Sequence, residues 1–456
     1  MQKLRDNIPG VIKGMIDVGM GIQIVLGILW MLGNMTVFHN YPDSYLYLKI
    51  SESLVCDEYE GILYPLMVRL FRGAEDLVGI PYYVFLYGIQ LGMAFAAAYC
   101  FLDTSWQQTT ARKIWASLGL VTFPLAMQCH LAVLPESLLS SLILMEFAVT
   151  IKEMRKTENS GMENVWMMAG LWGMEALLLP EYAVFGAIPL LICFILKVRI
   201  LLKQKHGFVQ WIAVVLLMAG VIILANSVTQ TPGAYEKTHN SFEWMAAKRT
   251  VWSRAEKNYG EWPKKAQAVV SEEQTRVINY YPDYLERYLG KVLEQEYGID
   301  EAGELFGQIA NVAWKYNRRS ILHDVFWDTA GLVAPAPFLQ LQLAGRGPTS
   351  GMGGNYDIMR QHTLKLTVAY VNYGCWWFCV LPILTLCRMV FFKKRRKRFY
   401  IPKSVWQYVL VGLATVGYYV MLCAGQMDYK KTIFISLLWI ACAIRICIGV
   451  SEETEC

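Results

Sequence analysis

The chain alternates between long apolar segments and short polar connections. The apolar segments are roughly 17 to 25 residues long, the length that a helix needs to cross a hydrocarbon core of about 30 Å. The pattern therefore predicts an all-α polytopic membrane protein with about ten transmembrane helices. The predicted spans are Met20–Phe38, Ile80–Leu102, Ile114–Gln128, Leu134–Ile151, Val165–Leu179, Tyr182–Ile200, Phe208–Ser227, Leu366–Met389, Val405–Cys423 and Ile433–Val450.

The composition agrees with this interpretation. Hydrophobic residues make up 55% of the 456 residues and charged residues only 17%, whereas a soluble domain carries about 25% charged residues. The cysteines lie mostly inside apolar segments and form no CxxC pattern, so the sequence predicts no structural metal. A divalent cation is left open as a cofactor.

The basic residues gather in short connections between the apolar segments. The positive-inside rule assigns such connections to the cytoplasm, which predicts a multi-pass plasma (cytoplasmic) membrane protein with both termini cytoplasmic. The net charge of +5 is divided among these loops, so it indicates no nucleic-acid partner. The clusters are Lys3/Arg5/Lys13, Arg112/Lys113, Lys152/Arg155/Lys156, Lys197/Arg199/Lys203/Lys205 and the run at residues 393–398.

Two segments then lie outside the cytoplasm. The first external loop, residues 39–79, belongs to an N-terminal transmembrane module of residues 1–228. Its apolar residues recur at helical spacing over residues 62–71 and 45–50, which predicts interfacial helices in the membrane plane. Residues 229–365 carry helical periodicity and predict a mostly helical extracytoplasmic domain. The C-terminal transmembrane helices follow in residues 366–456.

Asp43 is the first candidate for chemistry, because it lies only a few residues past the predicted outer end of the first span. A carboxylate there can take the proton of an acceptor hydroxyl in water while meeting a lipid-borne substrate in the bilayer. The structural alternative is a helix cap, since Pro-Asp-Ser is a good helix start.

Further carboxylates are expected at the same membrane face. Glu136 opens the fourth span, where it either stabilises the helix N-terminus or acts in catalysis. Glu175 and Glu181 flank the outer turn at Pro180 and, with Tyr45 and Tyr64, form the predicted substrate cavity. For Glu146, deeper in the fourth span, the sequence leaves a bundle contact and a functional role both open.

A phosphate-bearing substrate would require cations near this face. Arginine offers a planar fork that suits a phosphate. The alternative for each such residue is an ordinary solvated charge. The candidates are Arg69, Arg72, Arg249 and Arg254.

Three motifs resemble the GT-C class of membrane glycosyltransferases, in particular bacterial relatives of the protein O-mannosyltransferase and aminoarabinose-transferase type. They are DSYLY at residues 43–47 with GILYPL at 61–66, LAVLPESL at 131–138, and MAGLWGMEA at 168–176 with LPEYA at 179–183. The resemblance implies a polyprenyl-phosphate sugar donor, inverting transfer outside the cytoplasm, and Asp43 as the catalytic acidic residue. The family often has Asp-Glu where this chain has Asp43-Ser44, and a basic residue where it has Glu175.

The sequence thus predicts an enzyme embedded in the membrane lipid bilayer that passes a sugar to an extracytoplasmic acceptor, which is a glycan, a lipid or a protein. Two alternatives stay open, a multi-span transporter or flippase of lipid-linked glycans, and a catalytically degenerate GT-C scaffold. Transporters often contain repeats and broken helices near the bilayer midplane, and neither pattern is visible here.

Overall fold

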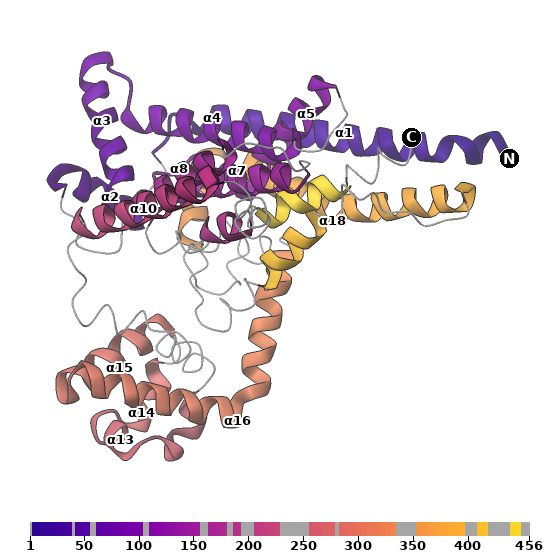
Figure 1. The fold of residues 1–456 in the computed structure, drawn as a ribbon. Helices are drawn as coiled ribbons and strands as arrows, with labels where there is room; N and C mark the ends of the chain where they lie inside the picture. The colour runs from indigo at the N-terminus through magenta and orange to yellow at the C-terminus, as the bar shows by residue number, and fades with distance from the viewer. Residues whose placement is uncertain are drawn as a thin grey trace. The chain divides into compact units, whose positions relative to one another are not determined.

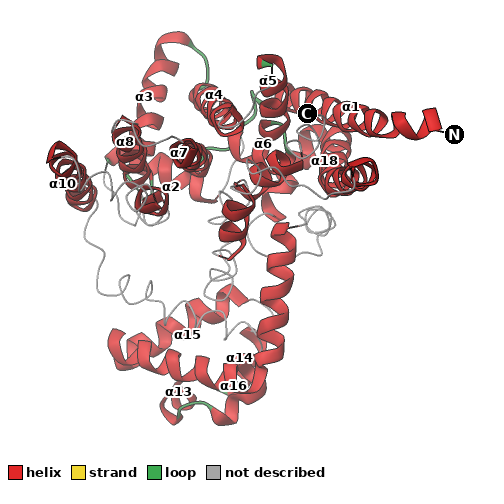
Figure 2. Cartoon of the chain, turned by 45° about the vertical axis from the view of Figure 1, so that its right-hand side comes forward, coloured by secondary structure: helices red, strands yellow, loops and turns green. Residues whose placement is uncertain are grey.

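The structure is a computed structural model of the whole chain, and every regular element that it describes is a helix (Figures 1 and 2). The chain separates into two compact units, residues 1–230 with 334–415 and 430–456, and residues 231–333 with 416–429. The structure describes residues 2–38, 42–54, 61–103, 109–155, 163–179, 186–192, 205–228, 255–278, 282–333, 353–396, 408–417 and 438–447.

Three helices among the described residues are long and apolar enough to cross a membrane. They are Gly10–Asn34, Tyr82–Asp103 and Leu366–Cys387. Large apolar side chains also lie exposed on these helices, which suggests membrane association because water would not solvate them favourably. On α1 they recur every three or four residues, at Val11, Met15, Val18, Ile22, Val25, Leu29 and Leu32.

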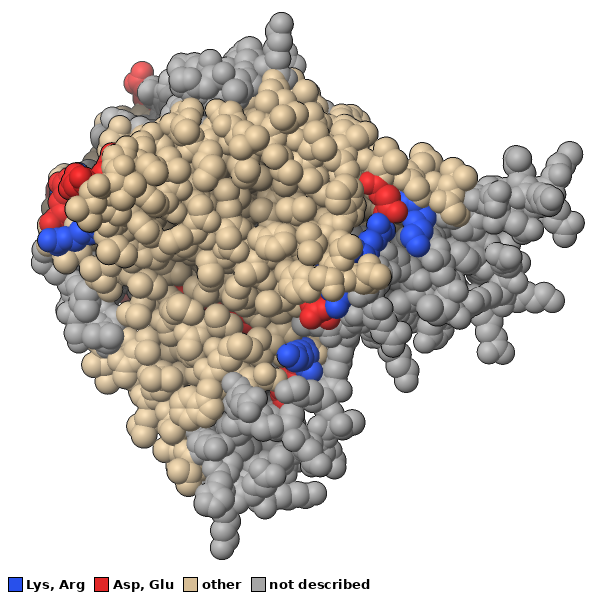
Figure 3. Space-filling view, turned by 90° about the horizontal axis from the view of Figure 1, so that it is seen from above, with Lys and Arg blue, Asp and Glu red and all other residues tan. Residues whose placement is uncertain are grey.

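The first unit is a helical bundle that contains these three helices. α1 packs along α18, and α4 packs along α7. Seen from above, its surface has a broad area without charge, and the charged side chains gather at the two sides (Figure 3). Its labelled helices are α1 (Gln2–Asn34), α2 (Pro42–Ser53), α3 (Leu63–Val78), α4 (Tyr82–Asp103), α5 (Thr110–Val121), α6 (Pro124–His130), α7 (Glu136–Arg155), α8 (Glu163–Leu178), α10 (Lys205–Val228) and α18 (Gly353–Arg396).

Several predicted spans differ from the helices observed; for example, Leu366–Met389 is part of the longer helix α18, Gly353–Arg396. α1 begins at Gln2, well before the predicted start at Met20, because the helical periodicity continues through Asp17, which pairs with Arg112 at 2.5 Å. The predicted third span, Ile114–Gln128, is two short helices, α5 and α6. The break falls before Pro124, which lacks the N–H that a continuous helix would need.

The first predicted external loop forms two helices, α2 and α3, at the positions where helical spacing was recognised. Both ribbon views show α3 running across the direction of α4 (Figures 1 and 2). Arg72 on α3 pairs with Glu52 on α2 at 2.8 Å. That the two helices lie in a membrane surface stays a prediction.

The second unit has a small hydrophobic core of its own. Trp262, Leu289, Leu293 and Phe306 are among its buried residues, so apolar burial holds these helices together. Its described elements are η2 (Ala255–Glu261), α13 (Lys264–Val269), α14 (Glu272–Ile278), α15 (Pro282–Tyr297) and α16 (Ile299–Val333).

Glu294 should make this unit sensitive to pH. Burial raises the pKa of Glu294 from its ordinary 4.5 to about 7. The folded unit therefore binds this proton more tightly than the unfolded chain, and its stability falls as pH rises from about 4.5 to about 7. We expect amide-exchange protection of α15 and α16 to decrease over this range, after correction for intrinsic exchange.

The matched variants are Glu294→Gln, which should flatten this pH dependence, and Glu296→Gln on the exposed side of the same turn, which should retain it. Protection that decreases equally in Glu294→Gln would assign the effect to another group.

Candidate functional site

The site is organised by the short non-helical segment between α6 and α7. Gln90 of α4 donates from its Nε2 to the carbonyl oxygens of Ala132 (3.0 Å) and Leu134 (3.2 Å). Ser44 of α2 donates from its Oγ to the carbonyl oxygen of Val133 at 3.1 Å. Three successive buried carbonyl oxygens thus accept hydrogen bonds from side chains, and buried backbone groups need such partners. The start of α7 is thereby fixed relative to α2 and α4.

Asp43 lies in the first turn of α2, immediately before this anchored Ser44. Glu136 is the first residue of α7, three residues after Val133, and only 8% of its side chain is exposed. The structure therefore brings the backbone at Asp43 next to the segment that carries Glu136. These two catalytic candidates are 93 positions apart in the sequence.

Tyr64 of α3 completes this cluster. It is fully buried and packs edge-on against Tyr47 of α2, with ring centroids 5.2 Å apart. Burial, and secondly the negative charge of Glu136, raise the pKa of Tyr64 well above 10. The phenol therefore keeps its proton at neutral pH and is a hydrogen-bond donor beside Glu136. Tyr45 is not part of this cluster, since its side chain is exposed on α2.

The end of α8 also meets this region. The Gly61 amide donates to the Leu178 carbonyl at 3.2 Å. A Cβ on Gly61 would lie 2.5 Å from the Leu177 carbonyl carbon, so only glycine allows this approach. The start of the GILYPL motif is therefore pressed against the last turn of α8.

Glu175 lies beside a second carboxylate in the bundle. It is fully buried on α8 and faces Glu146 of α7, across from Gly186. Glu146 is ten residues, or about 15 Å of helix, from Glu136. Glu175 is thus next to Glu146 inside the bundle, and its predicted role in the substrate cavity stays a prediction.

The arginine candidates are only partly described. Arg69 is exposed on α3, whereas Arg72 already pairs with Glu52. Arg249, Arg254 and Glu181 lie outside the described residues. In the described part of the chain, no group of three or more His, Cys, Asp and Glu residues is arranged to hold a metal ion.

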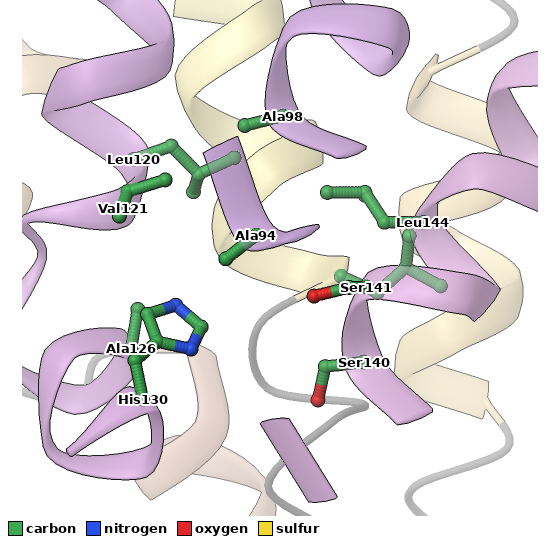
Figure 4. Close-up of a pocket in the computed structure, with 10 residues that line it drawn as sticks. Ala94, Ala98, Leu120, Val121, Ala126, His130, Ser140, Ser141 and Leu144 are labelled. Carbon is green, nitrogen blue, oxygen red and sulfur yellow. The ribbon is translucent and has the colours of Figure 1, made fainter. Parts of the chain in front are cut away.

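A small pocket lies between α4, α5, α6 and α7 (Figure 4). Its polar groups are already engaged. His130 Nδ1 is 2.8 Å from Ser137 Oγ, and the Ser140 and Ser141 hydroxyls donate to carbonyls of their own helix. The remaining lining is apolar, which suits a hydrocarbon group better than a sugar. The lining residues are Ala94, Ala98, Leu120, Val121, Ala126, His130, Ser140, Ser141, Leu144 and Leu438.

Comparisons of the chain with protein-family models, curated proteins and solved structures found no match.

The hydrogen bonds of Gln90 and Ser44 predict that removing each side chain lowers the free energy of unfolding by a different amount. Gln90→Leu removes the donor to two buried carbonyls and should lower the free energy of unfolding by about 2–3 kcal/mol. Ser44→Ala removes one donor and should cost about 1 kcal/mol. Ser53→Ala is the control for the second change, because Ser53 is an exposed serine of the same helix. Denaturant titration in detergent measures all three, and equal costs for Ser44 and Ser53 would contradict the anchoring role.

Proposed function

We propose that this chain is a membrane glycosyltransferase that moves a sugar from a polyprenyl-phosphate donor to an acceptor outside the cytoplasm. The observation that carries the proposal is the hydrogen bond from Ser44 to Val133. It joins the turn of Asp43 to the segment of Glu136, beside a buried phenol donor. Two acidic positions and a proton donor, gathered from α2, α7 and α3, provide what proton transfer to and from hydroxyl groups requires.

Ser44 also gives the chain's departure from the Asp-Glu motif a physical reason. Its side chain is fully buried and is used to hold a backbone carbonyl. A glutamate there would bring an acceptor-only carboxylate to a carbonyl oxygen, which it cannot bond. In our proposal Glu136 therefore supplies the second carboxylate of the site.

The proposed membrane arrangement has about ten spans, with α2 and α3 at the outer surface. In support, α3 runs across α4 and exposes Leu66, Leu70 and Leu77, while Tyr64 and Val68 are buried. This apolar face would enter the headgroup region and hold Arg69 at the level of the donor phosphate. Arg72 would have to exchange Glu52 for the phosphate, so Arg69 is the better candidate of the two.

In the proposed reaction, Asp43 accepts the proton of the acceptor hydroxyl as its oxygen attacks the anomeric carbon. The bond between that carbon and the phosphate oxygen breaks, and polyprenyl phosphate leaves as an anion. The configuration at the anomeric carbon is inverted. Residues 229–365 would select the acceptor, which is a glycan, a lipid or a protein.

The test is an assay on the purified chain in lipid nanodiscs, with radiolabelled polyprenyl-phosphate sugars and a panel of glycan, lipid and peptide acceptors. Time-dependent label in an acceptor supports transfer. In parallel, liposomes measure movement of the labelled lipid between leaflets. Movement without transfer would replace the proposal by the flippase alternative, and neither activity would favour a scaffold.

A further inference from the structure

The most unusual polar group of the bundle is the pair of Glu146 and Glu175. Both side chains have no exposed surface, and all four of their carboxylate oxygens lack a hydrogen-bond partner within the described structure. The charge of Glu175 acts directly on Glu146, so the two groups are close. A buried carboxylate is costly unless a proton, a donor or a cation compensates it.

Gly186 defines where the pair meets. A Cβ on Gly186 would overlap Glu175 Oε2 and would lie 3.1 Å from Glu146 Oε2. Carboxylates from two helices therefore converge on the backbone of a third helical segment, residues 186–192. The absence of a side chain at 186 is what allows both groups to occupy this place.

From this geometry we propose that Glu146 and Glu175 bind a hard divalent cation of the Ca²⁺ or Mg²⁺ class. If the pair carries fewer than two protons, at least one buried negative charge has to be compensated by another group. A cation can take oxygens from both carboxylates at once, and Ca²⁺ accepts bidentate carboxylates. The donors are oxygens only, which suits these ions better than zinc or copper.

The consequence concerns how the bundle is held together. α7 begins at Glu136, and α8 ends at the turn that receives Gly61. A cation between Glu146 and Glu175 would join these two helices and so fix the elements that carry the candidate site. The inference rests on the carboxylates alone and does not depend on the proposed sugar transfer.

The experiment uses the full chain in detergent, treated with EDTA and then desalted. Thermal unfolding is followed while Ca²⁺, Mg²⁺ or Mn²⁺ is added, with Na⁺ at matched ionic strength. A ligand that binds only the folded state raises Tm with its concentration. We expect saturable binding of one Mn²⁺ per chain by electron paramagnetic resonance, and a Tm that rises with the divalent ions only.

Glu146→Gln and Glu175→Gln should each weaken the cation affinity by about tenfold or more. Glu153→Gln is the matched control, because this buried carboxylate of the same helix already accepts a hydrogen bond from Asn164. Gly186→Ala keeps both charges and displaces the Glu175 carboxylate, so it should also weaken binding. If a glutamine variant does not fold, Gly186→Ala still shows whether cation binding depends on the position of the Glu175 carboxylate.

Two results would overturn the proposal. One is a wild-type chain that binds none of the three cations and unfolds at the same temperature with and without EDTA. The other is divalent binding that persists in the Glu146→Gln/Glu175→Gln double variant. If the wild-type chain binds no cation and the glutamine variants are as stable as wild type, the two carboxyl groups are neutralised by protons instead of a cation. Because neither readout uses sugar transfer, this failure is distinct from failure of the proposed function.

Discussion

Asp43→Asn is expected to lower sugar transfer by about 10²- to 10⁴-fold, the usual contribution of a general base. Asparagine has nearly the same shape as aspartate but cannot take the proton of the acceptor hydroxyl. The bond from Ser44 to Val133 does not involve the Asp43 side chain, so α2 should stay in place. Initial rates with saturating donor, together with thermal unfolding of the same sample, measure the two effects separately.

Asp76→Asn provides the control, since Asp76 is an exposed aspartate of α3 in the same predicted external loop. It should transfer at the wild-type rate. If Asp43→Asn also does so, the assignment of Asp43 as the base is wrong. If Asp43→Asn and Glu136→Gln each reduce transfer strongly without changing Tm, both carboxylates belong to the reaction.

Gly61→Ala is expected to destabilise the bundle by about 1–3 kcal/mol, as overpacking commonly does. The added Cβ would lie 2.5 Å from the Leu177 carbonyl carbon and 2.6 Å from that of Leu178. Backbone atoms cannot rotate away as a side-chain tip would, so α3 must move from α8. Because Tyr64 is three residues further along, transfer should fall together with stability.

Gly73→Ala is the comparison, because Gly73 lies inside α3 whereas Gly61 lies two residues before that helix begins. Nothing lies within 4 Å of a Cβ at this position, and alanine favours a helix over glycine by about 1 kcal/mol. Gly73→Ala should therefore be neutral or stabilising in a denaturant titration. Equal behaviour of the two variants would show that α3 is not held against α8 at Gly61.

Local patterns of the sequence were enough to find most of the helices. Apolar segments located α4 and α7, and helical spacing located α2 and α3 in the first predicted external loop. The predicted third span failed at Pro124, although proline is itself a local signal for a helix boundary. Proline alone does not decide this, since α18 continues as one helix through Pro382.

The assembly of the candidate site had no local signal. Ser44 and Val133 are 89 positions apart, and Gln90 meets a segment more than 40 positions away. Nothing in LAVLPESL indicates which side chains will satisfy its carbonyls. Gln90, a polar residue in an apolar span, was the one clue available. Glu146 and Glu175 were recognised as unusual singly, but their pairing depends on how α7 packs on α8.

The packing of α1 against α18 has a consequence for biosynthesis. Trp30 Nε1 donates to Thr367 Oγ1 at 3.0 Å, across 337 positions of sequence. At about 5–20 residues per second, a ribosome needs roughly 20–70 s to make that stretch. During this interval, Trp30 of α1 lacks Thr367 and also Tyr370, on which its ring later stacks. The contact between α1 and α18 therefore forms late in synthesis, long after α1 itself has been made.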